Sequence, residues 1–345
     1  MANPDQLSSR RPAFQAALHG WYRVHQRKLP WRDAPSLYKT VVSEFMLQQT
    51  QVVTVLPYFD RWLRALPDFA ALAAAPETQV MKLWEGLGYY SRARNLHRLA
   101  QAWVAAPTPP RTPAAWRELP GIGPYTAAAI TSISFDEPAA VVDGNVVRIL
   151  ARLTGENRLF RDGTEAVKFF TPLADALIPG SHPGTHNQAM MELGATVCFR
   201  QKPLCLVCPV AAFCTAFRDG EPESLPRLKP KVIEQRTIAR LWCVHQGRLL
   251  LQRGAAKARR LAGLHELPAA DIVGRAPAAR DLLVTKRRAI TRFQITESIY
   301  AAKLTPALKA AIARDDSLEW VPLQDLGQVT LSGPHRRWIT ALLAR

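Results

Sequence analysis

The sequence predicts a mainly α-helical N-terminal region followed by a smaller C-terminal α+β domain. From Pro12 to about Arg218 the apolar residues recur at helical spacing, between Ala-rich turns and with few β-branched runs. Residues 219–236 hold three prolines among basic side chains, a composition typical of a linker between domains. After this linker the apolar runs become short, as they are in β-strands.

Length and charge narrow the class of protein. A chain of 345 residues is long enough for two or three domains. Its net charge of +17 indicates a polyanionic partner, although ribosomal and membrane-surface proteins share this feature. No apolar run approaches the roughly 20 residues that a membrane helix needs, and residues 1–12 are too polar for a signal peptide. We therefore expect a cytoplasmic protein without a membrane partner.

The first candidate for chemistry is Glu44, which lies in a helical segment that is apolar on nearly every side. It shares a helix face with Val41 and Gln48. Burial there would raise the pKa of Glu44 and leave the side chain protonated, as a general acid must be. The alternative is structural: Glu44 would form a buried salt bridge with Arg27 or Arg32.

Two short helices are expected around a pair of glycines. The first begins at Thr112-Pro113, with threonine as the N-cap and proline in the first turn, and ends near Leu119. The second covers Tyr125–Ile133. Gly121 and Gly123 allow successive backbone amides to point outward beside a helix N-terminus, which makes a site for a phosphate. An ordinary helical turn is the alternative.

Asp143 stands immediately before an expected helix, Val146–Leu153. An aspartate at this place caps the helix N-terminus. The same placement keeps the carboxylate ionised and directed outward, as a group that stabilises developing positive charge must be. Cleavage of an N-glycosidic bond to a purine needs such a group beside the sugar, together with a proton for the departing base. A protonated Glu44 and an ionised Asp143 would supply both.

Four of the five cysteines follow the spacing C-x6-C-x2-C-x5-C, and Cys243 stands apart. Four thiolates suit either a tetrahedral zinc ion or a cubane iron-sulfur cluster. Structural zinc sites usually use two close C-x2-C pairs, whereas this run has one such pair flanked by wider gaps. The spacing resembles the 4Fe-4S loop of the endonuclease III superfamily of DNA glycosylases. The four residues are Cys198, Cys205, Cys208 and Cys214.

In the C-terminal domain we expect a β-hairpin around Gln246-Gly247, between strands at Ile238–His245 and Arg248–Arg253. The remaining expected elements are strands at Arg287–Leu304 and Leu318–Leu323 and a closing helix at His335–Ala344.

Several longer motifs resemble the adenine DNA glycosylases of the MutY type, a family of the helix-hairpin-helix glycosylase superfamily. The resemblance covers nearly the whole chain. The motifs are Leu29-Pro30-Trp31-Arg32, Ser43-Glu44 with Leu47 to Thr50, Trp84 to Arg92, Val142 to Asn145, and Asn187-Gln188-Ala189.

The resemblance implies a helix-hairpin-helix glycosylase domain over residues 1–218, with a six-helix part at about 34–140 and a cluster part formed by 1–33 and 141–218. After the linker at 219–236, residues 237–345 would form a Nudix-like domain that recognises 8-oxoguanine. The motifs behind this second domain are Leu249–Arg253 and Leu261–Pro268. No acidic box follows them, so this domain would bind and not hydrolyse.

The resemblance also assigns catalytic roles. Glu44 would protonate adenine and Asp143 would stabilise the sugar cation, while Tyr125 and Asn145 would orient them. Tyr125 stands where bifunctional members of the superfamily carry a lysine, and a phenol cannot form a Schiff base. Strand cleavage should therefore be absent or weak, and the enzyme should be monofunctional.

Further residues would hold the substrate and the cofactor. Arg27, Arg32 and Gln188 would line the adenine pocket, and Gln49 and Tyr89 would enter the duplex beside the opposite base. The lesion-reading loop, usually Phe-Ser-His, is Ile290-Thr291-Arg292 here, in which Thr291 keeps a hydroxyl. Contacts to the DNA backbone would come from Gly121, Gly123, Arg200 and Lys202. The four clustered cysteines would hold one 4Fe-4S cluster with a structural role.

The implied partner is double-stranded DNA with adenine opposite 8-oxoguanine or guanine, bound by a monomer in the bacterial cytoplasm in association with the nucleoid. Two rivals remain. One is a thymine/guanine mismatch glycosylase of the same superfamily. The other is a non-catalytic mismatch-binding protein, in which the burial of Glu44 would cost free energy and serve no function.

Overall fold

The structure is a computed structural model, and it describes residues 4–106, 108–255, 262–274, 277–290 and 292–344. The chain forms two compact units. The first, which we call the helical unit, consists of Met1–Ala73 and Arg98–Pro230. The second, the mixed unit, consists of Ala74–His97 and Lys231–Arg345. Each unit has its own apolar core, which is typical of domains that fold separately.

The helical unit confirms the all-α character expected for the N-terminal region. Its helices are amphipathic or fully buried, and its two short strands, β1 and β2, pair in parallel. Helix α7 (Ser91–Ala105) runs across the boundary between the two units. The other elements of the helical unit are α1 (Pro4–Ser9), α2 (Arg11–His25), α3 (Leu37–Leu47), α4 (Val52–Ala65), α5 (Phe69–Ala74), α8 (Pro113–Arg117), α9 (Pro124–Phe135), α10 (Gly144–Thr154), β1 (Leu159–Phe160), α11 (Gly163–Leu177), α12 (Pro183–Thr196), α13 (Thr215–Arg218) and β2 (Arg227–Leu228).

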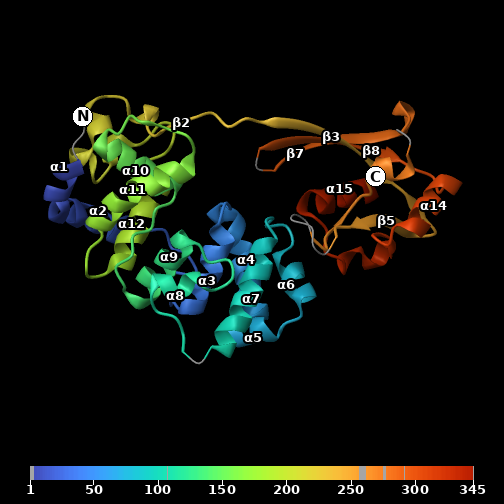
Figure 1. The fold of residues 1–345 in the computed structure, drawn as a ribbon, viewed down its shortest axis with the longest axis horizontal. Helices are drawn as coiled ribbons and strands as arrows, with labels where there is room; N and C mark the ends of the chain where they lie inside the picture. Colours follow the sequence, from blue (N-terminus) through green and yellow to red (C-terminus); the bar gives the residue numbers. More distant parts are fainter. Residues whose placement is uncertain (1–3, 107, 256–261, 275–276, 291, 345) are drawn as a thin grey trace. The chain divides into compact units, whose positions relative to one another are not determined.

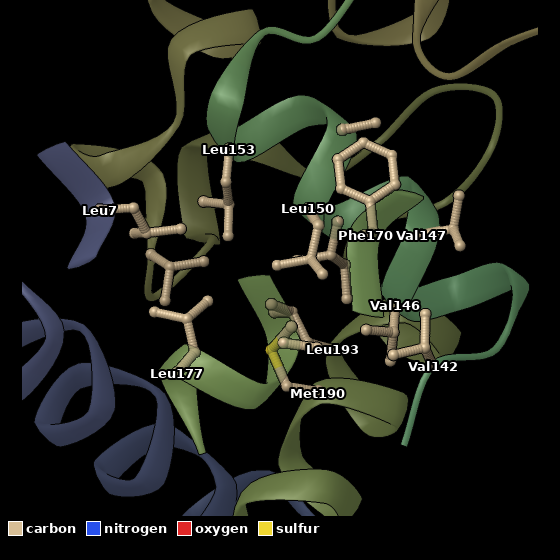
Figure 2. Packing of buried hydrophobic residues seen from close by; sticks show 14 of the residues in the cluster. Leu7, Val142, Val146, Val147, Leu150, Leu153, Phe170, Leu177, Met190 and Leu193 are labelled. Atoms are coloured by element: carbon tan, nitrogen blue, oxygen red, sulfur yellow. The ribbon is translucent and has the colours of Figure 1, made fainter. Parts of the chain in front are cut away.

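Helix α12 is central to the helical unit, because it packs against α2, α9 and α10 (Figure 1). Figure 2 shows Met190 and Leu193 of α12 beside Leu150 of α10 in one apolar cluster. These side chains are at most 3% exposed, and full burial of each stabilises the fold by about 1.5–3 kcal/mol. The packing fixes the faces of α9, α10 and α12 relative to one another, and these faces carry the candidate site.

The mixed unit contains two small sheets. In the first, β3 pairs in parallel with β8, and β8 pairs antiparallel with β7. In the second, β5 is flanked by antiparallel neighbours. The elements are α6 (Glu77–Trp84), β3 (Glu234–Trp242), β4 (Val244–His245), β5 (Arg248–Arg253), β6 (His265–Glu266), β7 (Leu282–Ile290), β8 (Phe293–Ala301), α14 (Pro306–Arg314), β9 (Leu318–Pro322) and α15 (Gly333–Leu343).

The C-terminal predictions are confirmed in part. The turn at Gln246 and Gly247 has positive φ at both residues, 48° and 70°, as a type I′ hairpin requires, and it joins β4 to β5. The strand expected over 238–245 is divided, however, because its first part belongs to β3 and pairs with β8. The strand expected over 287–304 is in fact two strands, β7 and β8. The sequence between them contains no glycine or proline, so it lacked a signal for two strands.

One segment of the mixed unit comes from the middle of the chain. Residues 74–97 pack with residues 231–345. The six-helix part at about 34–140, which the resemblance implies, stays a prediction. The Tyr90 hydroxyl donates a hydrogen bond to the Leu331 carbonyl at 3.1 Å, and Arg336 forms an ion pair with Glu85 at 2.7 Å. Partners so far apart in sequence leave no periodic signal, so the sequence could not reveal this division. Among the helices that the structure describes, none combines the length and the apolar character needed to cross a bilayer.

Candidate active site

A cavity of about 680 Å³ lies within the helical unit, bordered by α3, α9, α10 and α12 and by the chain after α2. It is large enough to bury a nucleotide-sized ligand. Eight residues that the sequence singled out separately line it together: Arg27, Arg32, Glu44, Tyr125, Asp143, Asn145, Gln188 and Arg200.

Glu44 is the buried acid of this cavity. It lies on α3, a helix capped by Ser36, whose hydroxyl accepts a hydrogen bond from the Lys39 amide at 3.2 Å. Its side chain is 6% exposed, and the Oε2 atom has no hydrogen-bond partner. Burial raises the pKa of Glu44 to about 7, and the charge of Asp143 also raises it, against lowering effects of Tyr125 and Arg32. A carboxyl in this state can hold a proton near neutral pH and release it.

The expected alternative, a salt bridge from Glu44 to Arg27 or Arg32, is wrong. Both arginines pair with Glu192 of α12 instead, at 2.6 Å from Arg27 Nε and 3.0 Å from Arg32 Nη2. Glu192 is fully buried. Sequence reasoning missed this residue, although a single carboxylate in an apolar helix, four positions after Gln188, was a signal of the same kind as Glu44.

Gln188 also lies on the cavity face of α12. Its Oε1 atom accepts hydrogen bonds from Arg32 Nε at 3.1 Å and from the Tyr22 hydroxyl at 3.3 Å. These contacts hold the amide in one orientation and leave its N–H₂ group for a ligand in the cavity. A fixed amide can read the hydrogen-bonding edge of a base.

Asp143 is both a helix cap and a carboxylate of the cavity. Its Oδ1 atom accepts hydrogen bonds from the amides of Asn145 and Val146 at 2.9 and 2.8 Å, and Oδ2 accepts one from Asn145 Nδ2 at 3.0 Å. Burial raises the pKa of Asp143, and the three hydrogen bonds and the charge of Arg148 oppose this effect. Because all three partners are N–H donors, they stabilise the ionised form. The helix cap and the outward-directed carboxylate, the two interpretations of Asp143 from the sequence, are therefore one arrangement.

Tyr125 occupies the first turn of α9 and lines the cavity. Its hydroxyl donates a hydrogen bond to Met191 Sδ at 3.2 Å. Burial and the nearby carboxylates raise the pKa of Tyr125 well above its ordinary value, so the phenol is neutral. A neutral phenol can donate a proton in a hydrogen bond to Glu44 but cannot act as an amine nucleophile.

The two helices around Gly121 and Gly123 form as expected. Helix α8 begins after Thr112, whose hydroxyl accepts from the Ala115 amide, and α9 begins at Pro124. Gly121 adopts φ +78°, a conformation that favours glycine, whereas Gly123 has extended backbone at the N-cap of α9. The hairpin thus presents a helix N-terminus without a side-chain cap, as an anion site requires.

The four clustered cysteines line one small cavity of about 20 Å³. None of the described cysteines forms a disulfide, and no His, Cys, Asp or Glu side chains of the described residues are already arranged around a metal position. The thiols are close enough to influence one another. Burial, with the charges of Cys198, Cys214 and Cys205, raises the pKa of Cys208 to about 12.

Arg152, which sequence reasoning missed, lies against this cavity and is 1% exposed. It donates hydrogen bonds to Cys198 Sγ at 3.2 Å and to the carbonyls of Phe199 and Arg200 at 2.6 and 2.9 Å. No carboxylate forms an ion pair with it within the described ranges. A buried cation without an anionic partner is costly. Four thiolates around a soft metal group would supply the missing negative charge, so the donor set fits such a group.

Other predicted residues lie away from the cavity. Gln49 adopts φ +56° just after α3 and does not line it. Lys202 lies in the cysteine loop, where its amide donates to Glu223 at 3.1 Å. Tyr89 belongs to the mixed unit, where it is 44% exposed with φ +48°. Thr291 lies outside the residues that the structure describes, and its neighbour Arg292 forms an ion pair with Glu234.

Parts of the chain are similar to known DNA repair proteins. Residues 42–168, which include Glu44, Tyr125 and Asp143, match the family described as HhH-GPD superfamily base excision DNA repair protein. The chain is 43% identical to the adenine DNA glycosylase of Mus musculus over 230 residues, 62% of this chain and 44% of that protein. It is 44% identical to the adenine DNA glycosylase of Homo sapiens over 224 residues, 62% of this chain and 41% of that protein. The chain thus spans about half the length of these curated relatives or less.

Solved structures agree on the fold. A thermostable thymine-DNA glycosylase matches with a TM-score of 0.55 and 27% identity, over 61% of this chain and 98% of that chain. An endonuclease III trapped as a covalent intermediate with DNA matches with a TM-score of 0.51 and 22% identity, over 64% of this chain and 99% of that chain, which shows the fold alone. Residues 42–168 therefore match the HhH-GPD superfamily of base excision DNA repair proteins, and the chain is similar to the adenine DNA glycosylases.

Proposed function

We propose that this protein is a monofunctional DNA glycosylase that hydrolyses the N-glycosidic bond of adenine mispaired with 8-oxoguanine or guanine in duplex DNA. The observation that carries the proposal is the buried Glu44, whose Oε2 atom has no hydrogen-bond partner and whose pKa is raised to about 7, in one cavity with the capped carboxylate of Asp143. The names of the related adenine DNA glycosylases support the choice of adenine.

The geometry supports different roles for Glu44 and Asp143. Protonated Glu44 gives its proton to the purine ring, so that the base departs as a neutral molecule. Ionised Asp143 stabilises the positive charge that grows on the sugar, because its oxygens are fixed before the reaction begins. Gln188 and Arg32 are held where they can bind the edge of a base that has left the duplex.

Water completes the reaction, because Tyr125 offers no amine. An aldehydic abasic site is then the product, and the DNA strand stays intact until it is treated with alkali. This is the chemical meaning of monofunctional in the proposal.

DNA binding in the proposal is mostly independent of sequence. The net charge of +17 attracts the phosphates, and the amides around Gly121 and Gly123 with Arg200 and Lys202 contact the backbone. Gln49 and Tyr89 enter the duplex beside the base opposite adenine. The mixed unit acts as a Nudix-like domain that binds the opposite base, with Thr291 in its lesion-reading loop.

Cys198, Cys205, Cys208 and Cys214 would hold one 4Fe-4S cluster. When bound, it supplies negative charge beside Arg152 and a rigid basic loop, and it takes no part in base release. The test is metal analysis of the purified protein. Four irons with acid-labile sulfide and a brown colour are expected, and Cys208→Ser should lose both. One zinc per chain, without sulfide, would contradict the cluster.

The activity is tested with three end-labelled duplexes, which carry A opposite 8-oxoguanine, A opposite G, and T opposite G. Breakage at adenine, and only after hot alkali, is expected. Glu44→Gln should bind the first duplex with parental affinity and excise nothing, because an amide cannot deliver the proton. Breakage at thymine would instead favour the activity named for the thermostable relative. Tight binding without excision by the parent would favour a non-catalytic mismatch binder.

A further inference from the structure

Glu192 is a fully buried carboxylate on α12, in the same cavity as Glu44. It accepts three hydrogen bonds from Arg27, from the backbone N at 3.0 Å, Nε at 2.6 Å and Nη2 at 3.0 Å. It accepts a fourth from Arg32 Nη2 at 3.0 Å. One carboxylate thus holds two guanidinium groups of the cavity.

The two arginines are oriented toward α12 and are thereby kept from pairing with α3. Arg32 donates to Gln188 Oε1 at 3.1 Å and to the Arg27 carbonyl at 3.2 Å, in addition to its bond with Glu192. Glu44, which lines the same space, keeps Oε2 without a hydrogen-bond partner. The charges in the cavity are therefore distributed unequally: Glu192 forms ion pairs with two arginines, and Glu44 forms an ion pair with neither of them.

The titratable groups around both acids are few. Glu44 is influenced by Tyr125 from α9, Asp143 from the N-cap of α10, and Arg32. Glu192 is faced by Arg27 and Arg32, and Tyr22 of α2 lies near the same arginines. Burial raises the pKa of Glu192, but hydrogen bonds from Arg27 and the charge of Arg32 outweigh this effect and lower it overall.

We propose that Glu192 is a positioning residue that keeps Glu44 protonated, because it engages the two arginines that would otherwise stabilise a Glu44 carboxylate. The inference rests on the proposed function, in which the proton of Glu44 is the one delivered to the base. Glu192 touches no reacting atom in this scheme, and it acts through Arg27 and Arg32. An opposite charge within hydrogen-bonding reach lowers the pKa of a carboxyl by about 1–3 units, so release of one arginine is enough to change the protonation of Glu44.

The test is the pH profile of single-turnover adenine excision, with the chain in excess over the A:8-oxoguanine duplex, from pH 5 to pH 8.5. In the parent, the rate should fall as pH rises through the pKa of Glu44. Glu192→Gln removes the charge at almost constant shape, and its profile should move to lower pH by about 1–3 units. For a shift of about one unit, its rate should approach the parental rate at pH 5 and lie about eightfold below it at pH 7.5, and a larger shift should widen both differences.

Two further variants separate charge from structure. Glu192→Asp keeps the negative charge, and its midpoint should stay close to that of the parent. Arg32→Gln removes a cation that lowers the pKa of Glu44, so its midpoint should move in the opposite direction, to higher pH. This variant keeps the inference testable if Glu192→Gln does not fold, because an unchanged midpoint in Arg32→Gln would overturn the inference. Glu165→Gln, an exposed glutamate of the same unit, is the control and should match the parent.

A purely structural role of Glu192 predicts a different result. Its loss would then slow excision by the same factor at every pH, and that outcome would overturn the inference. Absence of adenine excision by the parent at all pH values would instead refute the proposed function and is recognised before any variant is made.

Discussion

The raised pKa of Glu44 lowers the stability of the folded chain at neutral and alkaline pH. The pKa of Glu44 in the folded chain is raised to about 7 from an ordinary 4.5, chiefly by burial. In the unfolded chain the same group loses its proton near pH 4.5. Between these two values the unfolded state loses a proton that the folded state keeps, so stability falls as pH rises. Above pH 7 the whole cost is present, and below pH 4.5 it is absent.

Glu44→Gln should therefore stabilise the DNA-free protein at alkaline pH. The free energy of unfolding should exceed that of the parent by about 3 kcal/mol at pH 8, because 2.5 pKa units are removed at about 1.4 kcal/mol each. The difference should vanish near pH 4. Chemical denaturation of the helical unit at the two pH values measures it. Glu137→Gln, at an exposed position, should show no such dependence, and a Glu44→Gln variant less stable at pH 8 would contradict the assignment.

Tyr125 offers a second residue-scale prediction. Tyr125→Lys places an amine in the cavity with Asp143, where burial lowers the pKa of a lysine and leaves part of it neutral. The variant should be trapped on mismatched DNA by borohydride, whereas the parent should not. Tyr125→Phe, which lacks an amine, is the matched control. Trapping of the parent would show that another amine of the chain attacks the sugar.

At the scale of the secondary-structure element, a helix N-cap fixes the position of the Asp143 carboxylate. Asp143 ends an extended segment and caps α10, so the bonds that begin the helix also fix the carboxylate. Asn187 of α12 holds that segment: its Oδ1 accepts from the Val141 amide at 3.0 Å, and its Nδ2 donates to Ser132 Oγ and the Ala139 carbonyl. Asn187 of α12 thus holds the segment that carries the Asp143 carboxylate, and its neighbour Gln188 lines the cavity.

The hairpin between α8 and α9 gives the element-scale prediction. Gly121→Ala forces a side chain into φ +78°, at a cost of about 1–2 kcal/mol, and should turn the amides of this loop away from a phosphate. Affinity for matched and mismatched duplexes should fall by the same factor, because phosphate contacts carry no sequence information. Fluorescence anisotropy at fixed salt measures this change. Gly180→Ala, where φ is not positive and the added Cβ meets nothing within 4 Å, should bind as the parent does. Loss of affinity for the mismatch alone would contradict the role of the hairpin.

At the scale of the whole molecule, segments that are far apart along the chain belong to the same folded unit. Residues 74–97 belong to the mixed unit, where Glu85 pairs with Arg336 of α15 and accepts a hydrogen bond from the Leu331 amide at 3.1 Å. The two side chains are 10% and 28% exposed, so water only partly screens their attraction. Leu331 and Arg336 thus hold Glu85 in place, and the turn at Tyr89-Tyr90 comes only four residues after Glu85.

Arg336→Met should loosen α6 within the mixed unit. The loss of a charged hydrogen bond to Glu85 costs about 1.5–3 kcal/mol, so amide hydrogen exchange over Glu77–Trp84 should accelerate about tenfold or more. Exchange in α10 should remain at the parental rate. A double exchange, Glu85→Arg with Arg336→Glu, should recover part of the protection. Equal acceleration in α10 would show general unfolding and refute the local anchor.

Local patterns predicted much of this molecule. The N-caps at Thr112 and Asp143, the helical burial of Glu44, and the hairpin at Gln246-Gly247 depend on neighbours within a few residues, and the structure has each of them. Eight of the residues that motif resemblance singled out line one cavity, because the motifs had already joined distant segments of the chain. Glu192 was missed although its place in an apolar helix resembles that of Glu44, and Arg152 was missed because no sequence pattern marked it.

By itself, the sequence determined where helices begin and end and which acid is surrounded by apolar side chains, since these properties depend on contacts a few residues apart. The tertiary structure alone decided which carboxylate receives Arg27 and Arg32, which are more than 150 residues from Glu192. It also decided that β3 lies parallel to β8 and that residues 74–97 join the C-terminal region. The reason is physical: competing partners of like charge or like hydrophobicity are distinguished by packing, and packing is a property of the folded chain.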